Sequence, residues 1–164
     1  IEAARKIINS TEKVTFSILG PLLEGYKEVS QDRVDDWIKE GFVYLGFTDN
    51  VKEEIRKHDC IVLPSYYREG VPKSLMEAAA MGKPIITCDS IGCRELVDDG
   101  INGFLCRPKD PEDLKVKMMK IIKLTHQERI DMGLQGRKKV VSHFDENIVI
   151  NKYLEEINLI LGNN

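Results

Sequence analysis

The sequence predicts a doubly wound α/β fold, in which helices cover both faces of a parallel sheet. Two observations lead to this prediction. Short apolar runs typical of strands alternate with amphipathic stretches typical of helices as far as residue 106, and such alternation favours a parallel sheet. The 164 residues, of which 42% are hydrophobic, are also enough for one domain with an adequate core.

Residue types that start or stop chain elements separate the expected strands and helices. Gly20-Pro21 ends the first strand, Gly41 ends the helix before the second strand, and Asp49-Asn50 caps the following helix. Gly82 and Pro84 end a helix further along. Strands are expected at 14–19, 42–45, 60–63, 84–88 and 103–106, and helices at 1–8, 31–39, 51–58, 73–81, 94–97, 111–124, 125–143 and 145–161.

Composition and charge exclude several classes of function. The net charge of −3 argues against a nucleic-acid-binding protein, which usually carries a basic balance. No apolar run approaches the roughly 20 residues needed to cross a bilayer. The four cysteines lack C-x-x-C spacing and the three histidines lack ligand spacing, so we expect no metal site.

Two carboxylates eight positions apart mark the most informative stretch of the chain. Glu69 lies on a loop after the apolar run 60–63, and Glu77 lies about one turn inside the next helix. The amides at the start of that helix lack intrahelical acceptors and favour an anion. This context predicts a site for a nucleotide sugar. Two structural alternatives stay open: Ser74 and Glu77 match a capping box, and Glu69 could be a solvated loop acid.

The stretch from residue 69 to 86 resembles the E-x7-E signature region of retaining GT-B glycosyltransferases of the family-4 group. Residues 42–47, 87–97 and 99–105 are similar to other segments of that group, in the same order. The resemblance implies a Rossmann-like, donor-nucleotide-binding C-terminal half of a GT-B enzyme. It divides the chain into a nucleotide-sugar-binding domain, 1–143, and a helix, 144–164, that would pack towards an N-terminal domain.

The resemblance also implies a role for individual residues. Glu69 would be catalytic and contact donor-sugar hydroxyls, while Glu77 would accept hydrogen bonds from the ribose hydroxyls. The base would lie against residues of the loop after the second strand, with core packing as the alternative for the phenylalanine: Gly46, Phe47 and Thr48. The diphosphate would lie at the helix N-terminus: Gly70, Val71, Pro72, Lys73, Ser74 and Leu75.

The implied substrates are a nucleoside diphosphate sugar, UDP-linked by expectation, and a glycan or lipid-linked acceptor, with no metal or other cofactor. Such an enzyme would be cytoplasmic and work in capsule, O-antigen or exopolysaccharide synthesis. An alternating basic face suggests peripheral contact with an anionic membrane surface, with an ordinary solvated surface as the alternative: Lys115, Lys117, Lys120 and Lys123. A nucleotide-sugar epimerase and a receiver-like signalling domain are the competing functions.

The family's Arg and Lys that contact the diphosphate find no match in this chain. The chain also opens on a helical pattern without a preceding strand and without an initial Met, so we expect an N-terminally truncated fragment that is inactive alone. The resemblance places the family's first strand between strands 14–19 and 60–63. We therefore expect that these two strands pair directly, that a partner fills the slot, or that upstream residues do.

Overall fold

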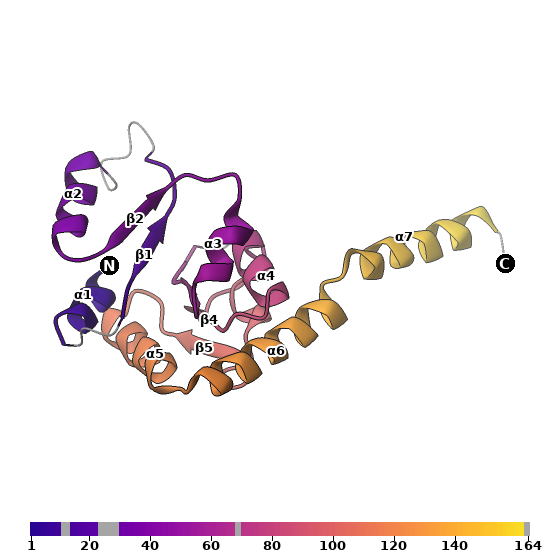
Figure 1. Cartoon of the computed structure of the whole chain (residues 1–164). Coiled ribbons are helices and arrows are strands. Elements are labelled where there is room, and N and C mark those ends of the chain that lie inside the picture. The colour runs from indigo at the N-terminus through magenta and orange to yellow at the C-terminus, as the bar shows by residue number, and fades with distance from the viewer. Residues whose placement is uncertain (11–13, 23–29, 68–69, 163–164) are drawn as a thin grey trace.

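The structure is a computed structural model that describes residues 1–10, 14–22, 30–67 and 70–162. Within these residues the strands form two parallel sheets (Figure 1). One sheet pairs β1 (Ser17–Leu19) with β2 (Val43–Gly46). The other has the order β3 (Ile61–Leu63), β4 (Ile85–Cys88) and β5 (Gly103–Cys106). The predicted parallel α/β class is therefore confirmed.

Side-chain caps set the start of most helices. Ser30, Asn50, Asp110 and Thr125 each accept a hydrogen bond from the amide three residues further on, and Asp145 accepts one from Asn147. Most helix boundaries lie within one or two residues of the predicted ones. The helices are α1 (Glu2–Ile8), α2 (Gln31–Lys39), α3 (Val51–Lys57), α4 (Lys73–Ala80), the 3₁₀ helix η2 (Arg94–Leu96), α5 (Pro111–Lys123), α6 (His126–His143) and α7 (Glu146–Leu161).

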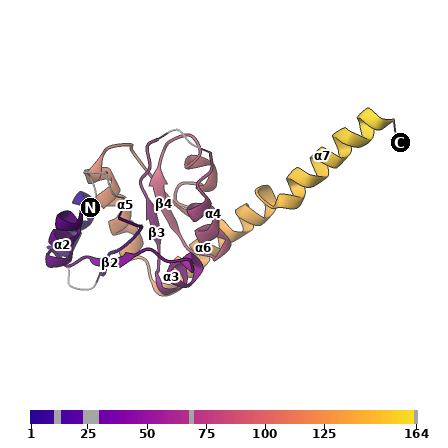
Figure 2. The same cartoon turned by 90° about the horizontal axis from the view of Figure 1, so that it is seen from above.

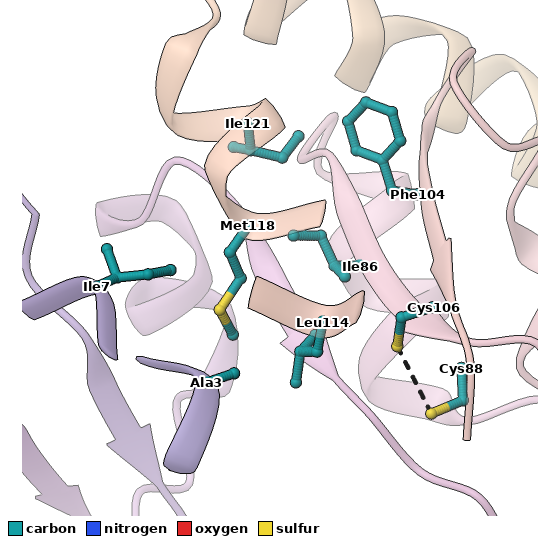
Figure 3. Close-up of a cluster of buried hydrophobic side chains, with 9 residues drawn as sticks. All are labelled: Ala3, Ile7, Ile86, Cys88, Phe104, Cys106, Leu114, Met118 and Ile121. Carbon is teal, nitrogen blue, oxygen red and sulfur yellow. Dashed lines mark hydrogen bonds between the residues drawn. The ribbon is translucent and has the colours of Figure 1, made fainter. Parts of the chain in front are cut away.

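Strand β4 separates two hydrophobic clusters, and all four of its residues are buried. The cluster on one side joins α1 and α5 to the sheet (Figure 3): Ala3, Ile7, Ile86, Cys88, Phe104, Cys106, Leu114, Met118 and Ile121. The cluster on the other side joins α3, α4 and η2: Ile55, Leu75, Ala78, Ala79, Ile85, Cys93, Leu96 and Val97. Helices therefore cover both faces of this sheet, as a doubly wound fold requires.

The slot expected between β1 and β3 is not closed by direct pairing. In the described residues, β1 pairs with β2 and β3 pairs with β4, so the two strands that flank the expected slot do not pair with each other. The strands that flank the slot, β1 and β3, are also less buried than β4. Each residue of β4 is buried, whereas β3 is only half-buried along its length and Leu19 at the end of β1 is exposed.

The basic face of α5 is partly engaged with the protein itself. The Lys117 ammonium lies 3.7 Å from an Asp99 carboxylate oxygen, and that lysine side chain is only 15% exposed. The ammonium groups of Lys117 and Lys120 also lie 6.0 and 5.1 Å from the centre of the Phe104 ring. These contacts weaken the case for a membrane-facing surface. No helix in the described residues is long and apolar enough to span a bilayer.

Helix α7 extends away from the remainder of the molecule (Figures 1 and 2), and none of its residues is buried. Its exposed side chains include large apolar ones such as Tyr153, Leu154 and Ile157. The helix starts next to the predicted division at residue 144, and its packing towards another domain stays a prediction.

Two thiols on neighbouring strands are expected to be unreactive in the folded chain. Cys88 and Cys106 are buried in register on β4 and β5, with their Sγ atoms 3.7 Å apart (Figure 3). Burial raises the pKa of Cys106 to about 12 and raises the pKa of Cys88 as well. Both groups therefore stay protonated at pH 8, where the attacking thiolate is scarce. We expect maleimide to label them at pH 8 only after urea unfolding, as read by mass spectrometry. Labelling in native buffer at the unfolded rate would contradict this.

Candidate functional site

The N-terminus of α4 follows β3 through a loop and is open to a ligand. Its N-cap residue is Pro72, which has no side-chain acceptor. The amides of Leu75 and Met76 both donate to the Pro72 carbonyl, each at 3.1 Å. The amides of Lys73 and Ser74 have no intrahelical acceptor, and both residues are exposed. These two amides, at the positive end of the helix dipole, favour an anion.

Glu77 lies in the second turn of α4, and its side chain is 24% exposed. Its Oε1 atom is 3.9 Å from Nζ of Lys73, which is itself at the helix N-terminus. The capping-box alternative is wrong because α4 begins at Lys73, so that Ser74 lies inside the helix and makes no cap. The Glu77 carboxylate is therefore held near the open helix terminus rather than used to complete it.

The remaining residues of this predicted set differ in what they can offer. Gly70 has open space around it, since a Cβ built there would meet no atom within 4 Å. Val71 and Pro72 are half-buried. Leu75 is fully buried against Ala78 and Ala79. Its side chain lies in the core and its amide donates to the Pro72 carbonyl, so Leu75 offers neither group to a donor, which corrects its place among the donor-binding residues. Glu69 lies outside the described residues, and its role stays a prediction.

The loop after β2 holds the residues predicted to contact a base. Phe47 is 69% exposed, so the core-packing alternative for this ring is wrong. Gly46 has a φ of 67°, a left-handed conformation that favours glycine and turns the chain after the strand. The Thr48 hydroxyl accepts a hydrogen bond from the Asn50 amide at 3.1 Å. This loop leads into α3, and α3 and α4 pack in one cluster through Ile55 and Leu75.

Two buried hydroxyls that sequence reasoning missed fix the chain after β3. Thr87 donates to the carbonyl of Leu63 at 2.7 Å, and Ser90 donates to the carbonyl of Ser65 at 3.0 Å. Both donors belong to β4 or its exit loop and are buried. They hold the start of the β3–α4 loop against the neighbouring strand. The signal available in the sequence was a hydroxyl within, and another directly after, an otherwise apolar run.

In the described part of the chain, two shallow hollows lie away from the residues predicted to bind the donor. One of about 340 Å³ lies between α1 and α2, against residues such as Arg5 and Trp37. The other, of about 260 Å³, lies between the loop at Gly100 and α6. Among the described residues, no group of three His, Cys, Asp or Glu side chains could hold a metal ion.

Comparison with known proteins gives a consistent result. A family model described as glycosyl transferases group 1 matches residues 1–123. A curated relative from Campylobacter jejuni, named N,N'-diacetylbacillosaminyl-diphospho-undecaprenol alpha-1,3-N-acetylgalactosaminyltransferase, is 32% identical over 130 residues. That alignment covers 78% of this chain and 34% of the relative, so the chain spans about a third of its length.

Solved structures share the fold. A glycosyltransferase from Rickettsia africae superposes with a TM-score of 0.84 and 22% identity, covering 99% of this chain and 44% of that protein. Anabaena Alr3699/HepE, solved in complex with UDP, superposes with a TM-score of 0.80 and 21% identity, covering 95% of this chain and 44% of that protein. At such identities the likeness establishes the fold alone.

Proposed function

Because the chain belongs to the glycosyl transferases group 1 family, we propose that it is the donor-binding domain of a retaining glycosyltransferase that uses a nucleoside diphosphate sugar. The observation that carries the proposal is the open terminus of α4 with the Glu77 carboxylate one turn inside it. The family match favours this function over a receiver-like signalling domain, for which the exit of β1 at Gly20-Pro21 also lacks the required acids.

The diphosphate would lie at the first turn of α4. The amides of Lys73 and Ser74 can donate to phosphate oxygens, and the exposed Lys73 ammonium adds positive charge nearby. Gly70 leaves room for close approach because no Cβ occupies the space above it. Glu77 can then accept from two adjacent ribose hydroxyls, a charge-assisted pair of bonds.

The base would stack on the exposed ring of Phe47, next to Gly46 and Thr48. Stacking on an aromatic ring accepts any base, so this contact supports affinity without choosing between UDP and other nucleotides. Uracil is the base we propose, and hence UDP the nucleotide, since Anabaena Alr3699/HepE was solved in complex with UDP. No metal or other cofactor enters the proposal, because the helix terminus and Lys73 supply the positive charge.

The proposed acceptor is a glycan or a lipid-linked sugar, in capsule, O-antigen or exopolysaccharide synthesis at the cytoplasmic side of a membrane. The name of the Campylobacter relative supports a lipid-linked acceptor, because it specifies a diphospho-undecaprenol. The chain spans about a third of the Campylobacter relative. We assign acceptor binding, and the Arg and Lys that would stabilise the leaving diphosphate, to the part of such a protein that the chain does not cover. The chain alone should therefore bind donor without transferring sugar.

Thermal denaturation with nucleotides tests the proposal. We expect millimolar UDP to raise the Tm of the chain, whereas uridine, which lacks phosphate, should raise it far less. UDP at a concentration of 100 times its Kd would add about 2.7 kcal/mol to the free energy of unfolding. GDP and ADP should be run in parallel, since stabilisation by any of the three supports a donor site. The absence of a shift with all three would overturn it. An activity assay of a longer protein that carries this chain separates the two enzyme classes. A transferase moves the sugar to an acceptor, whereas an epimerase changes the configuration of the sugar.

Glu69 is expected to act on the sugar rather than on the nucleotide. In an active protein that carries this chain, Glu69→Ala should lower kcat strongly. The free energy of UDP binding should change by less than about 0.5 kcal/mol, the scale of substitutions away from a contact. Steady-state kinetics and calorimetry with UDP give the two quantities. A loss of UDP affinity equal to that of Glu77→Ala would show that the two roles are assigned wrongly.

A further inference from the structure

Two of the four cysteines face each other, whereas the other two face backbone carbonyls. The Sγ atoms of Cys88 and Cys106 lie 3.7 Å apart, as a thiol–thiol hydrogen bond (Figure 3). The thiols of Cys60 and Cys93 instead donate to backbone carbonyls at 3.7 and 3.9 Å. All four cysteines are free. The fold therefore brings one pair of free thiols within reach of a covalent bond.

The backbone holds this pair at a separation that a disulfide accepts. Cys88 and Cys106 are the last residues of β4 and β5 and are register partners in the parallel sheet. Neighbouring strands lie about 4.7–4.9 Å apart, and disulfides span roughly 4.4–6.8 Å between Cα atoms. The amide of Asp89 donates to the Cys106 carbonyl at 2.8 Å, so the pairing continues beyond Cys88. A bond between the sulfurs can therefore form by rotation of two side chains while the strands keep their register.

The surroundings of the pair decide when it can react. Cys88 and Cys106 are each 1% exposed, within the cluster that also holds Leu114. Burial raises the pKa of both thiols, to about 12 for Cys106. The folded chain therefore offers little thiolate, and it has no room there for a reagent as large as a tripeptide. Reaction with such a reagent requires the ends of β4 and β5 to open, which exposes both thiols.

We propose that Cys88 and Cys106 are an oxidative modification site, at which exchange with a small disulfide such as oxidised glutathione joins β4 to β5. One cysteine thiolate attacks the reagent, forms a mixed disulfide and releases the first glutathione thiolate. The other cysteine thiolate attacks the protein sulfur of the mixed disulfide and releases the second glutathione. Two protons pass from the cysteines to the two glutathiones. The pair loses two electrons, and the glutathione disulfide is reduced to two thiols.

The bond would lock the ends of β4 and β5 together in oxidising conditions. Its two cysteines are 18 positions apart, and the loop that it closes contains η2. Closing such a loop restricts the unfolded chain and so favours the folded one. For a loop of this length in a chain of this size, the Tm should rise by about 6–12 °C. Neither thiol is among the predicted donor-binding residues, so this inference goes beyond the proposed function and does not depend on it.

Disulfide mapping of the 164-residue chain tests the site. The dilute chain is equilibrated at pH 8 with oxidised and reduced glutathione, in urea below the unfolding midpoint, so that disulfides can reshuffle. It is then returned to buffer, blocked with N-ethylmaleimide and digested. The four thiols, taken in pairs, allow six disulfides within the chain. We expect mass spectrometry to find mainly the bond between Cys88 and Cys106. Predominance of another pair, or of free thiols even under the most oxidising ratio, would overturn the site.

Thermal denaturation tests the lock. The oxidised chain should have a Tm about 6–12 °C above that of the reduced chain, and dithiothreitol should abolish the difference. Cys88→Ala should lose both the bond and the shift. Cys60→Ala, at a cysteine that packs against the same cluster, should keep both. The comparison of oxidised with reduced unmodified chain decides the question even where Cys88→Ala does not fold. A Tm that oxidation leaves unchanged or lowers would overturn the lock.

The rate of oxidation tests the need for opening. In buffer without urea, oxidation by glutathione disulfide should be at least about 100-fold slower than in the unfolded chain. The rate should rise with urea as the opened population rises. Equal rates for the folded and unfolded chains would overturn the opening step. Nucleotide plays no part in these measurements. Failure of UDP to stabilise the chain would therefore overturn the proposed function alone, and a different disulfide would overturn this site alone.

Discussion

Gly133→Ala is expected to lower the free energy of unfolding by about 2–4 kcal/mol, the range of severe overpacking. Helix α6 crosses the end of α4 at this glycine, and a Cβ there would lie 1.8 Å from the Gly82 carbonyl oxygen. That carbonyl cannot move cheaply. The amides of Gly82 and Lys83 are bonded back to Ala79 and Ala78 at 2.9 and 3.0 Å. The two helices must therefore separate.

Urea denaturation followed by circular dichroism measures the effect, and the same helix offers a matched control. At Gly136, one turn along α6, a Cβ would meet nothing closer than 3.7 Å. Gly136→Ala should therefore leave stability unchanged or raise it by up to about 1 kcal/mol, the difference in helix propensity between the two residues. Equal destabilisation by the two substitutions would show that loss of glycine, rather than the close crossing at Gly82, is responsible.

Glu77→Ala is expected to weaken UDP binding by roughly 1–3 kcal/mol, which is about 5- to 150-fold in Kd. The substitution removes the carboxylate proposed to accept from the ribose hydroxyls and leaves the fold intact, since the side chain is partly exposed and its ionic contact with Lys73 is long at 3.9 Å. Isothermal titration of the chain with UDP gives the Kd directly.

Two further variants sharpen this measurement. Glu77→Gln keeps the shape but loses the charge, so its effect should lie between those of the alanine variant and the natural residue. Glu155→Ala removes an exposed carboxylate from α7, far along the chain from the site, and should leave the Kd unchanged. An unchanged Kd in Glu77→Ala would remove this residue from the nucleotide site.

The order of strands and helices could be predicted because its signals are local. Pro111 with two following acids predicts the start of α5, and the structure places that helix start at Pro111. The apolar run before Cys88 predicts a buried strand, and each residue of β4 is buried. The match of Ser74 and Glu77 to a capping box was misleading, because the pattern does not include the fixed φ of Pro72, which starts the helix earlier.

The candidate site could be predicted only in part, because the missing members depend on contacts between distant segments. Phe47 could not be recognised as exposed, since its position directly after a strand is compatible with core packing as well as with a surface position. The burial of Leu75 could have been inferred from its position on the inner face of α4, next to Ala78 and Ala79.

The packing of α1 on α5 has a consequence for the time at which the chain can fold during synthesis. Ile7 and Leu114 share one cluster (Figure 3), and Lys6 pairs with Glu112, which is 106 positions away. A ribosome that adds 5–20 residues per second needs roughly 5–20 s to reach α5 after making α1. During that interval the apolar face of α1, including Ala3 and Ile7, has no partner helix. The nascent chain therefore exposes this apolar face until α5 emerges.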